Sequence, residues 1–198
     1  MLDELYGRAI LPEPDDRRPK GYGAHEVLPP RSLSILSAET AEHLKGFMRS
    51  VEAAWAMGNL FMARTTVLWL VDNDGEIRFA IEEYVHNGKI DQVSEAWYQD
   101  IPYHRITDDY EFLLPTNTKL GHPSLVSCQE ARIAGEIGFY SLEGADQKTW
   151  NLNAHSGRYG VWVTHAERRK IHLWNVSYRF RDHRIALKID PKGPKGWR

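Results

Sequence analysis

The sequence predicts an α+β fold in which a mainly antiparallel sheet of hairpins is packed by two amphipathic helices. Two turn sequences, at 72–75 and 144–147, each separate a pair of strand-like segments. Two further segments, about 37–57 and 165–181, repeat apolar residues at the three- and four-residue spacing of a half-buried helix. The length of 198 residues fits one domain, which we expect to span 37–190.

A proline-rich arm is predicted to precede this domain, over residues 1–36. Five of the ten prolines fall within 11–31, which disfavours a helix and favours an extended chain that lies over the body or moves freely. Ser37 then opens the first helix, and Gly58-Asn59 offers a stop. The buried stripe of this helix is predicted to comprise Leu44, Phe47, Met48, Val51, Ala54 and Trp55.

The strands are predicted from apolar runs and alternation. The unbroken apolar run 67–71 indicates a strand inside the sheet, whereas Ile77, Phe79 and Ile81 alternate with other residues and give 76–83 one dry face. A helix, most economically the one from Ser37, should cover that face. Between 86 and 118 we expect a loop with one short helix or strand, and a second hairpin follows over 131–143 and 148–154.

The second helix is predicted to start at Thr164, whose hydroxyl can cap it. We place Ile171, Trp174 and Tyr178 on one side of this helix, flanked by Leu173, Val176 and Phe180. Residues 185–189 are expected to form a last strand, and 191–198 a flexible basic tail.

Composition restricts the classes of protein. Cys128 is the single cysteine, which excludes an internal disulfide and every multi-cysteine zinc site. We find neither a secretory signal nor an apolar run long enough to span a membrane, so we expect a cytoplasmic protein without a membrane partner. Export by a route that uses no cleaved signal is compatible with the same sequence.

Charge is distributed unevenly along the chain. Residues 165–198 hold ten Lys/Arg against three Asp/Glu, a balance of +7, and residues 1–164 hold 15 against 24, a balance of −9. We interpret the basic section as a solvated helix face plus a loose tail, with phosphate, nucleic acid or an acidic protein as alternative partners. Nucleic acid is the least favoured of these, because domains that bind it are usually more basic.

Chemically capable side chains concentrate between His122 and Tyr159. Histidine is the residue type suited to act as an acid or a base near neutral pH, which makes His122 and His155 candidates, and Glu136 can orient a histidine or take a proton itself. Ser156-Gly157-Arg158-Tyr159 places a hydroxyl, an unhindered amide and a guanidinium in one turn, which suits a phosphate or carboxylate. The candidate catalytic residues are His122, Glu136 and Tyr159, and the candidate ligand-binding residues are Ser124, Ser156, Gly157 and Arg158.

We predict that five of these side chains share one concave surface at the sheet edge, because 120–126, 131–143 and 148–154 are all strand-like. The five are His122, Glu136, Ser156, Arg158 and Tyr159. Antiparallel pairing should set Glu136 nearly opposite Ala154 or His155. Purely structural interpretations stand beside this one: a His122 bonded to backbone, a solvated Glu136, and a turn followed by a packed Tyr159. No metal site is expected, because a site needs three or four convergent ligands and the nine histidines show no ligand spacing apart from His165 and His172, which are seven residues apart.

The order of these residues resembles a module of the form H-S-S…A-G-E…S-G-H-Y. It is found in plant IQ-motif calmodulin-binding proteins and at the C-termini of some bacterial polymorphic toxins. The resemblance covers about residues 120–160, with Pro123 in place of the first serine, Arg158 in place of the last histidine, and no proline after Tyr159. The matching positions are His122, Ser124, Ala134, Gly135, Ser156, Gly157 and Tyr159.

The resemblance implies a domain of the toxin or effector type. From the residues themselves we expect a polar cleft that binds, and in an enzyme transforms, a phosphate-bearing small molecule such as a nucleotide. In a transferase acting on NAD, Arg158 would contact the phosphates, Tyr159 would stack, and Glu136 would stabilise developing positive charge. The alternative is a non-catalytic immunity protein that covers a basic toxin through its acidic body. A weaker alternative is nucleic-acid contact through the basic section. The sequence identifies no cofactor and leaves catalysis itself open.

Overall fold

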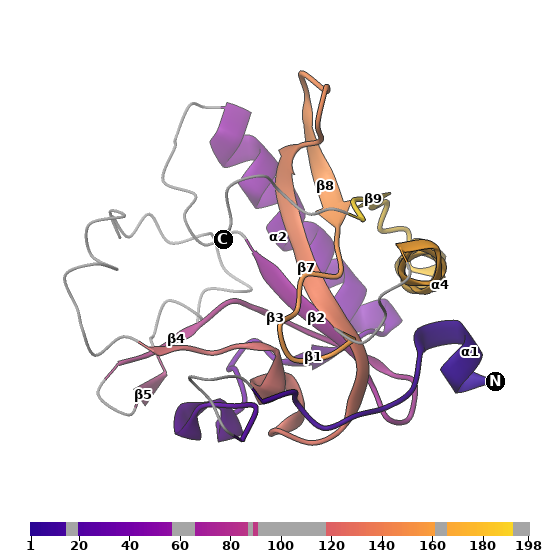
Figure 1. The fold of residues 1–198 in the computed structure, drawn as a ribbon. Helices are drawn as coiled ribbons and strands as arrows, with labels where there is room; N and C mark the ends of the chain where they lie inside the picture. Colours follow the sequence, from indigo (N-terminus) through magenta and orange to yellow (C-terminus); the bar gives the residue numbers. More distant parts are fainter. Residues whose placement is uncertain (15–19, 57–65, 87–88, 91–117, 161–165, 192–198) are drawn as a thin grey trace.

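The computed structural model describes residues 1–14, 20–56, 66–86, 89–90, 118–160 and 166–191 (Figure 1). It confirms the α+β class. The described strands form a six-stranded sheet in the order β1-β3-β2-β7-β8-β9 and a three-stranded sheet in the order β5-β4-β6. In the larger sheet only β8 and β9 pair in parallel. Its strands are β1 (Ser34–Ile35), β2 (Val67–Asp72), β3 (Ile77–Ile81), β7 (Ala131–Ser141), β8 (Lys148–Leu152) and β9 (Lys188–Ile189).

The first hairpin forms where the sequence predicts it, with β2 between β3 and β7 and every residue of β2 buried. Its turn is braced by Asp72, whose Oδ1 accepts hydrogen bonds from the backbone amides of Asp74 and Glu76. The smaller sheet consists of β4 (Tyr84–His86), β5 (Lys89–Ile90) and β6 (Thr118–Lys119). Strand β5 falls within the stretch 86–118, where we expected a loop with one short helix or strand, and β4 and β6 lie at its two ends. Residues 87–88 and 91–117 of that stretch lie outside the described residues.

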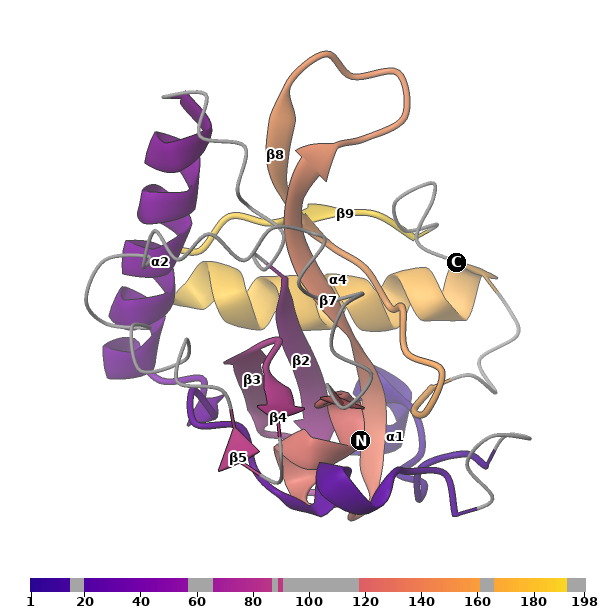
Figure 2. The same ribbon diagram turned by 90° about the vertical axis from the view of Figure 1, so that its left-hand side faces the viewer.

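Helix α2 (Ala38–Ala56) begins directly after Ser37, whose hydroxyl accepts a hydrogen bond from the amide of Thr40. The predicted stripe is buried as far as Val51, whereas Trp55 is 37% exposed and stacks under the Lys148 ammonium, 3.4 Å from the ring centroid. Helix α4 (Ala166–Asp182) crosses behind β7 and β2 (Figure 2). Both helices contribute to the main core on one face of the sheet.

Burial distinguishes the two sets of apolar residues that the sequence places on α4. Leu173, Val176 and Phe180 are fully buried, whereas Ile171, Trp174 and Tyr178 are about half exposed. Both sets have helical spacing, so periodicity does not distinguish them. Packing decides between them, because the Phe180 ring meets Phe79 of β3 edge-on at 6.5 Å. The predicted cap, Thr164, lies outside the described residues.

The opposite face of the sheet carries a second, smaller core, made of Leu68, Leu70, Ala80, Leu125, Ala131, Ala134 and Tyr159. It is covered partly by η3 (His122–Val126), a 3₁₀ turn in the segment where we expected a strand. Pro123, with its fixed φ and no N–H, sits in the first turn of η3, and Ser127 and Cys128 follow with φ of 47° and 63°. Two successive left-handed residues end the turn and exclude a strand there.

The N-terminal arm packs on the body. Helix α1 (Leu2–Tyr6) lies beside α4 (Figure 1), and Leu5 O accepts hydrogen bonds from His172 Nδ1 and Asn175 Nδ2 at 2.9 and 2.8 Å. Further along the arm, Ile10 forms a β-bridge with Ala131. Beyond it, the 3₁₀ turn η1 (Ala24–Val27) carries the buried Glu26, whose carboxylate accepts the backbone amides of Gly23 and Gly121. This contact ties the arm to the start of η3.

Candidate functional site

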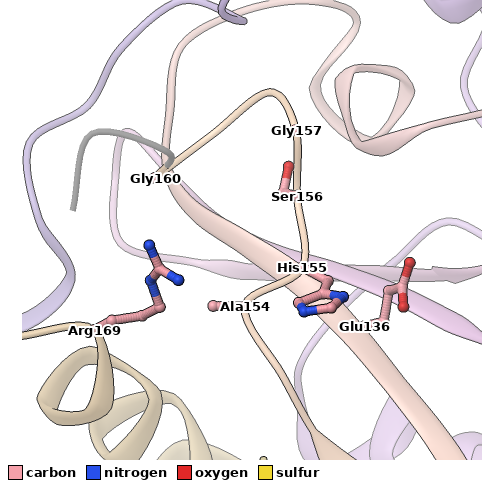
Figure 3. A pocket seen from close by; sticks show the side chains of 7 residues that line it. All are labelled: Glu136, Ala154, His155, Ser156, Gly157, Gly160 and Arg169. Carbon is pink, nitrogen blue, oxygen red and sulfur yellow. The ribbon is translucent and has the colours of Figure 1, made fainter. Parts of the chain in front are cut away.

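A polar hollow of about 430 Å³ opens where the chain leaves β8 and crosses back toward α4 (Figure 3). Strand β7 contributes Glu136, and the first turn of α4 contributes Arg169. The loop after β8 supplies the remaining wall. The lining residues are Glu136, Ala154, His155, Ser156, Gly157, Gly160 and Arg169.

Side chains that bond to backbone hold the loop after β8 in shape. Asn153 Oδ1 accepts hydrogen bonds from the amide of Glu136, at 3.2 Å, and from that of His155, at 2.8 Å. Ser156 Oγ accepts the amides of Arg158 and Tyr159, both at 3.2 Å. These contacts are an Asx-turn and a Ser-turn in succession. The wall of the hollow is therefore a braced turn rather than a loose connection.

Glycine 135 permits the close approach of this loop to β7. A Cβ built on Gly135 would lie 1.9 Å from the carbonyl oxygen of Asn153, which no side chain tolerates. The strand pairing differs by one residue from the expectation: the amide of Asn153 donates to Glu136 O at 3.0 Å, so Asn153, not Ala154 or His155, is opposite Glu136. The shift follows from the hairpin, whose last pair is Ser141 with Lys148.

Glu136 is half-buried on the face of the sheet that also carries Ala134 and Leu68. Burial raises the pKa of its carboxyl, and the negative charge of Glu82 raises it further. Lys119, His155 and Asn153 oppose that rise. Glu82 is itself buried and ion-paired with Lys119, whose Nζ lies 2.5 Å from Glu82 Oε1. The Glu136 carboxyl is thus biased toward its protonated form at the wall of the hollow.

Figure 3 shows two opposed sides of the hollow. The imidazole of His155 lies beside the Glu136 carboxylate, and the guanidinium of Arg169 points toward the loop from the side of α4. Gly157 forms the open part of the wall, because a Cβ added there would meet no atom within 4 Å. A cation thus faces a carboxyl and an imidazole across the hollow.

Three of the predicted residues, Glu136, Ser156 and Gly157, line this hollow. The other four have structural contacts elsewhere. Ser124 Oγ donates to Gly121 O at 2.7 Å, and Arg158 is buried with Nη1 3.3 Å from Glu13 O. Tyr159 is 1% exposed in the second core and donates its hydroxyl to Gln129 O at 2.9 Å.

His122 is buried as well, and its Nε2 donates to Gly135 O at 2.9 Å. Burial lowers the pKa of the imidazole to about 4, with smaller contributions from Lys119 and Arg158, and the bond to Gly135 opposes that shift. The ring is therefore neutral near pH 7. A neutral ring committed to a backbone carbonyl braces β7 against η3.

Several of the positions on which the proposed resemblance depends bond to or pack against one another in this chain. His122 bonds to Gly135, Gly135 accommodates the backbone at 153–154, and Ser156 accepts the amide of Tyr159. Their spacing in the sequence therefore corresponds to one packing unit beneath the hollow.

Arg169, Gly160 and Ala154 were not among the predicted site residues. Arg169 belongs to the basic section that we interpreted as a solvated face, and the signal available was its position in the first turn of a helix that follows a polar loop. Gly160 has φ of 74°, a conformation that favours glycine. His155 was predicted as an acid or base and lies at the hollow.

Within the part of the chain that the structure describes, no cluster of three His, Cys, Asp or Glu side chains is arranged to hold a metal ion. Among the same residues, no helix has the length and apolar character needed to cross a membrane. Comparison with protein-family models, curated proteins and solved structures found no match. The proposals below therefore rest on geometry and chemistry.

Proposed function

We propose that the hollow binds a small phosphate-bearing molecule such as a nucleotide, in a domain of the toxin or effector type. The observation that carries this proposal is how the groups around the hollow are arranged. The Arg169 guanidinium and the open backbone at Gly157 can contact an anion, and Glu136 and His155 lie beside each other on the opposed side. Arg169 takes the anion-binding role that the sequence suggested for Arg158.

The ligand class follows from the donors around the hollow. A guanidinium binds phosphate through two parallel N–H groups, which gives both charge and direction. The absence of a side chain at Gly157 lets a ligand approach the backbone closely. A volume of about 430 Å³ lies within the range of small-molecule sites and accommodates a group the size of a nucleotide.

Glu136 and His155 supply the chemistry in the catalytic form of this proposal. A carboxyl whose pKa is raised by burial can donate or accept a proton closer to neutral pH than an ordinary glutamate. His155, beside it, is the partner with which it would exchange that proton. Together they are suited to general acid–base assistance of a group transfer from the phosphate-bearing ligand.

Titration calorimetry with pyrophosphate, ADP and NAD tests the binding step. We expect Arg169→Gln to weaken the best of these ligands at least about tenfold, since a charged hydrogen bond contributes roughly 1.5–3 kcal/mol. Gly157→Leu should abolish binding by occupying the hollow while the protein stays folded. Arg168→Gln is the matched control, because Arg168 is exposed one position away and does not line the hollow.

Equal loss in Arg168→Gln and Arg169→Gln would reduce the effect to general electrostatics and contradict the site. Tight binding retained by a folded Gly157→Leu protein would place the ligand elsewhere. If the folded wild-type protein binds none of the three ligands, the hollow is not a site for phosphate-bearing molecules.

The toxin setting is tested by induced expression in a bacterial host. Growth should slow with the wild-type protein and recover with Arg169→Gln at equal soluble yield. The −9 balance of residues 1–164 favours the alternative, an immunity protein that covers a basic toxin. In that case the wild-type protein is harmless and Arg169→Gln changes nothing.

A further inference from the structure

Arg158 belongs to the turn that the sequence marks as suited to phosphate, yet it does not line the hollow. Its neighbours Ser156 and Gly157 do, whereas the Arg158 side chain is 7% exposed and contacts the N-terminal arm. Arg158 Nη1 donates to Glu13 O at 3.3 Å, and Arg158 O accepts the amide of Glu13 at 2.9 Å. The arm therefore holds both the backbone and the guanidinium of Arg158, one residue away from the wall of the hollow.

Residues 8–13 of the arm, which we call the strap, make this contact. Ile10 exchanges two backbone hydrogen bonds with Ala131 at the start of β7, both at 2.9 Å. Glu13 then makes the two bonds to Arg158. All four bonds use backbone groups of the strap, so the strap lies along the body much as an added strand lies along the edge of a sheet.

The strap lies between two anchors and buries little itself. Within it, Pro12 alone is buried, and Ile10 packs only in part against the second core. Before the strap, α1 buries Tyr6 and accepts hydrogen bonds from α4. After it, the buried Glu26 bonds to the start of η3. Segments with few buried contacts open at the lowest cost in free energy, so the strap can detach while both anchors stay in place.

We propose that Arg158 is a second phosphate ligand of the hollow and that the strap withholds it. When the strap detaches, the Arg158 guanidinium turns from Glu13 O toward the phosphate held by Arg169. The strap is thus an autoinhibitory contact that keeps the affinity of the hollow low. This inference rests on the proposed function, because it assigns a further phosphate contact to the same hollow.

The chemistry of the two acceptors favours this exchange. The strap offers Arg158 the neutral carbonyl of Glu13 at 3.3 Å, whereas phosphate oxygens are charged and bind a guanidinium through two parallel hydrogen bonds. The turn itself does not need to refold, because Ser156 Oγ already holds the amides of Arg158 and Tyr159. Only the direction of one long side chain changes.

Arg132 provides a comparison within the same molecule. It is also 7% exposed, and its Nη1 donates to Gly7 O in the arm at 2.9 Å, just before the strap begins. Its Nε and Nη2 donate to Asn73 O in the turn between β2 and β3, at 3.3 and 3.0 Å. Arg132 is therefore held by the body, and it should stay covered when the strap detaches.

Phenylglyoxal, which modifies accessible guanidinium groups, tests the strap without any ligand. The double variant Ile10→Pro/Glu13→Pro removes two backbone donors of the strap. We expect the modification rate of Arg158 to rise several-fold in this variant. Arg132 should stay protected, and Arg168, which is exposed on α4, should react equally in both proteins. Peptide mass spectrometry measures each arginine separately.

A second variant reaches the strap from outside. A Cβ on Gly21 would lie 2.0 Å from Pro12 O, so Gly21→Ala displaces the strap while keeping its backbone donors, and it should also expose Arg158. Leu11→Ser is the matched control, because it changes a strap side chain that is 60% exposed and keeps every backbone group. It should leave Arg158 protected. Thermal unfolding verifies that each variant is folded.

Titration calorimetry with pyrophosphate tests the role of Arg158. We expect the folded strap variants to bind pyrophosphate at least about tenfold more tightly than the wild type, since Arg158 then adds a charged hydrogen bond. Arg158→Gln in the same variants should remove this gain.

Protection of Arg158 in both folded strap variants would overturn the strap. A reactive Arg158 without a gain in pyrophosphate affinity, or a gain that survives Arg158→Gln, would overturn its role as a phosphate ligand. Failure of the proposed function has a different signature, which is wild-type binding of pyrophosphate that Arg169→Gln does not weaken.

Discussion

The residues in and around the candidate site form two groups that differ in what surrounds them. The bracing group is buried and bonded to backbone: His122, Ser124, Arg158 and Tyr159. The lining group borders the hollow: Glu136, His155, Gly157 and Arg169. Ser156 belongs to both, because it lines the hollow and holds the turn. The contrast teaches that side chains with catalytic chemistry can be present in one short segment chiefly to position it.

Tyr159→Ala should give the largest effect, a loss of about 3–5 kcal/mol in the free energy of unfolding, because it empties the second core. Tyr159→Phe keeps the ring and loses the bond to Gln129 O, so about 1 kcal/mol is expected. Urea unfolding measures both. A Tyr159→Ala protein as stable as the wild type would move Tyr159 out of the bracing group.

Two glycines allow the same contrast between packed and open positions to be tested with one methyl group. Gly135→Ala should cost about 2–3 kcal/mol, because its Cβ collides with backbone at Asn153 and Ala154. Gly157→Ala adds the same methyl group where no atom lies within 4 Å, and we expect a change below about 0.5 kcal/mol. Thermal or urea unfolding of the pair provides the measurement, and equal losses would contradict the assignment of the two glycines to different surroundings.

The pH dependence of stability should have opposite signs for His122 and Glu136. The pKa of His122 is about 4 in the folded protein and 6.5 in the unfolded chain, so the unfolded chain takes up the proton first as the pH falls. His122 therefore reduces the free energy of unfolding by about 2 kcal/mol between pH 7.5 and pH 5. The raised pKa of Glu136 acts oppositely: its contribution is lost as the pH rises from 4.5 through the folded pKa.

Urea unfolding of the wild type, His122→Gln and Glu136→Gln at pH 5 and 7.5 measures these two contributions, because each variant removes one of the two titrating groups. His122→Gln should lose less stability on acidification than the wild type, and Glu136→Gln should lose more. Parallel pH profiles for all three would mean that neither group is as buried as the structure has it.

Ser156→Ala should give the smallest measurable loss, about 1 kcal/mol, because it removes the acceptor of the Arg158 and Tyr159 amides without opening a cavity. Urea unfolding measures the loss, and ligand titration under the same conditions shows whether Ser156 also contributes to the hollow. Unchanged stability would assign Ser156 to the lining group alone.

Much of the fold was predictable because its signals are local. The turn around Asp72, the apolar run of β2 and the start of α2 after Ser37 each depend on neighbours within a few residues. The candidate site was predictable only in part. Glu136, Ser156 and Gly157 line the hollow as expected, but Arg169 reaches it from a helix more than ten residues further along the chain.

The sequence by itself determined the class of fold, the two hairpins and the two long helices, because side-chain periods of two and 3.6 are properties of each segment alone. Tertiary packing decided which apolar stripe of α4 turns inward, since both stripes have helical spacing and only Phe180 meets Phe79. It also decided that His122 and Tyr159 brace while Arg169 faces the hollow. Burial and charge at a side chain depend on atoms brought from distant segments, and no local pattern encodes them.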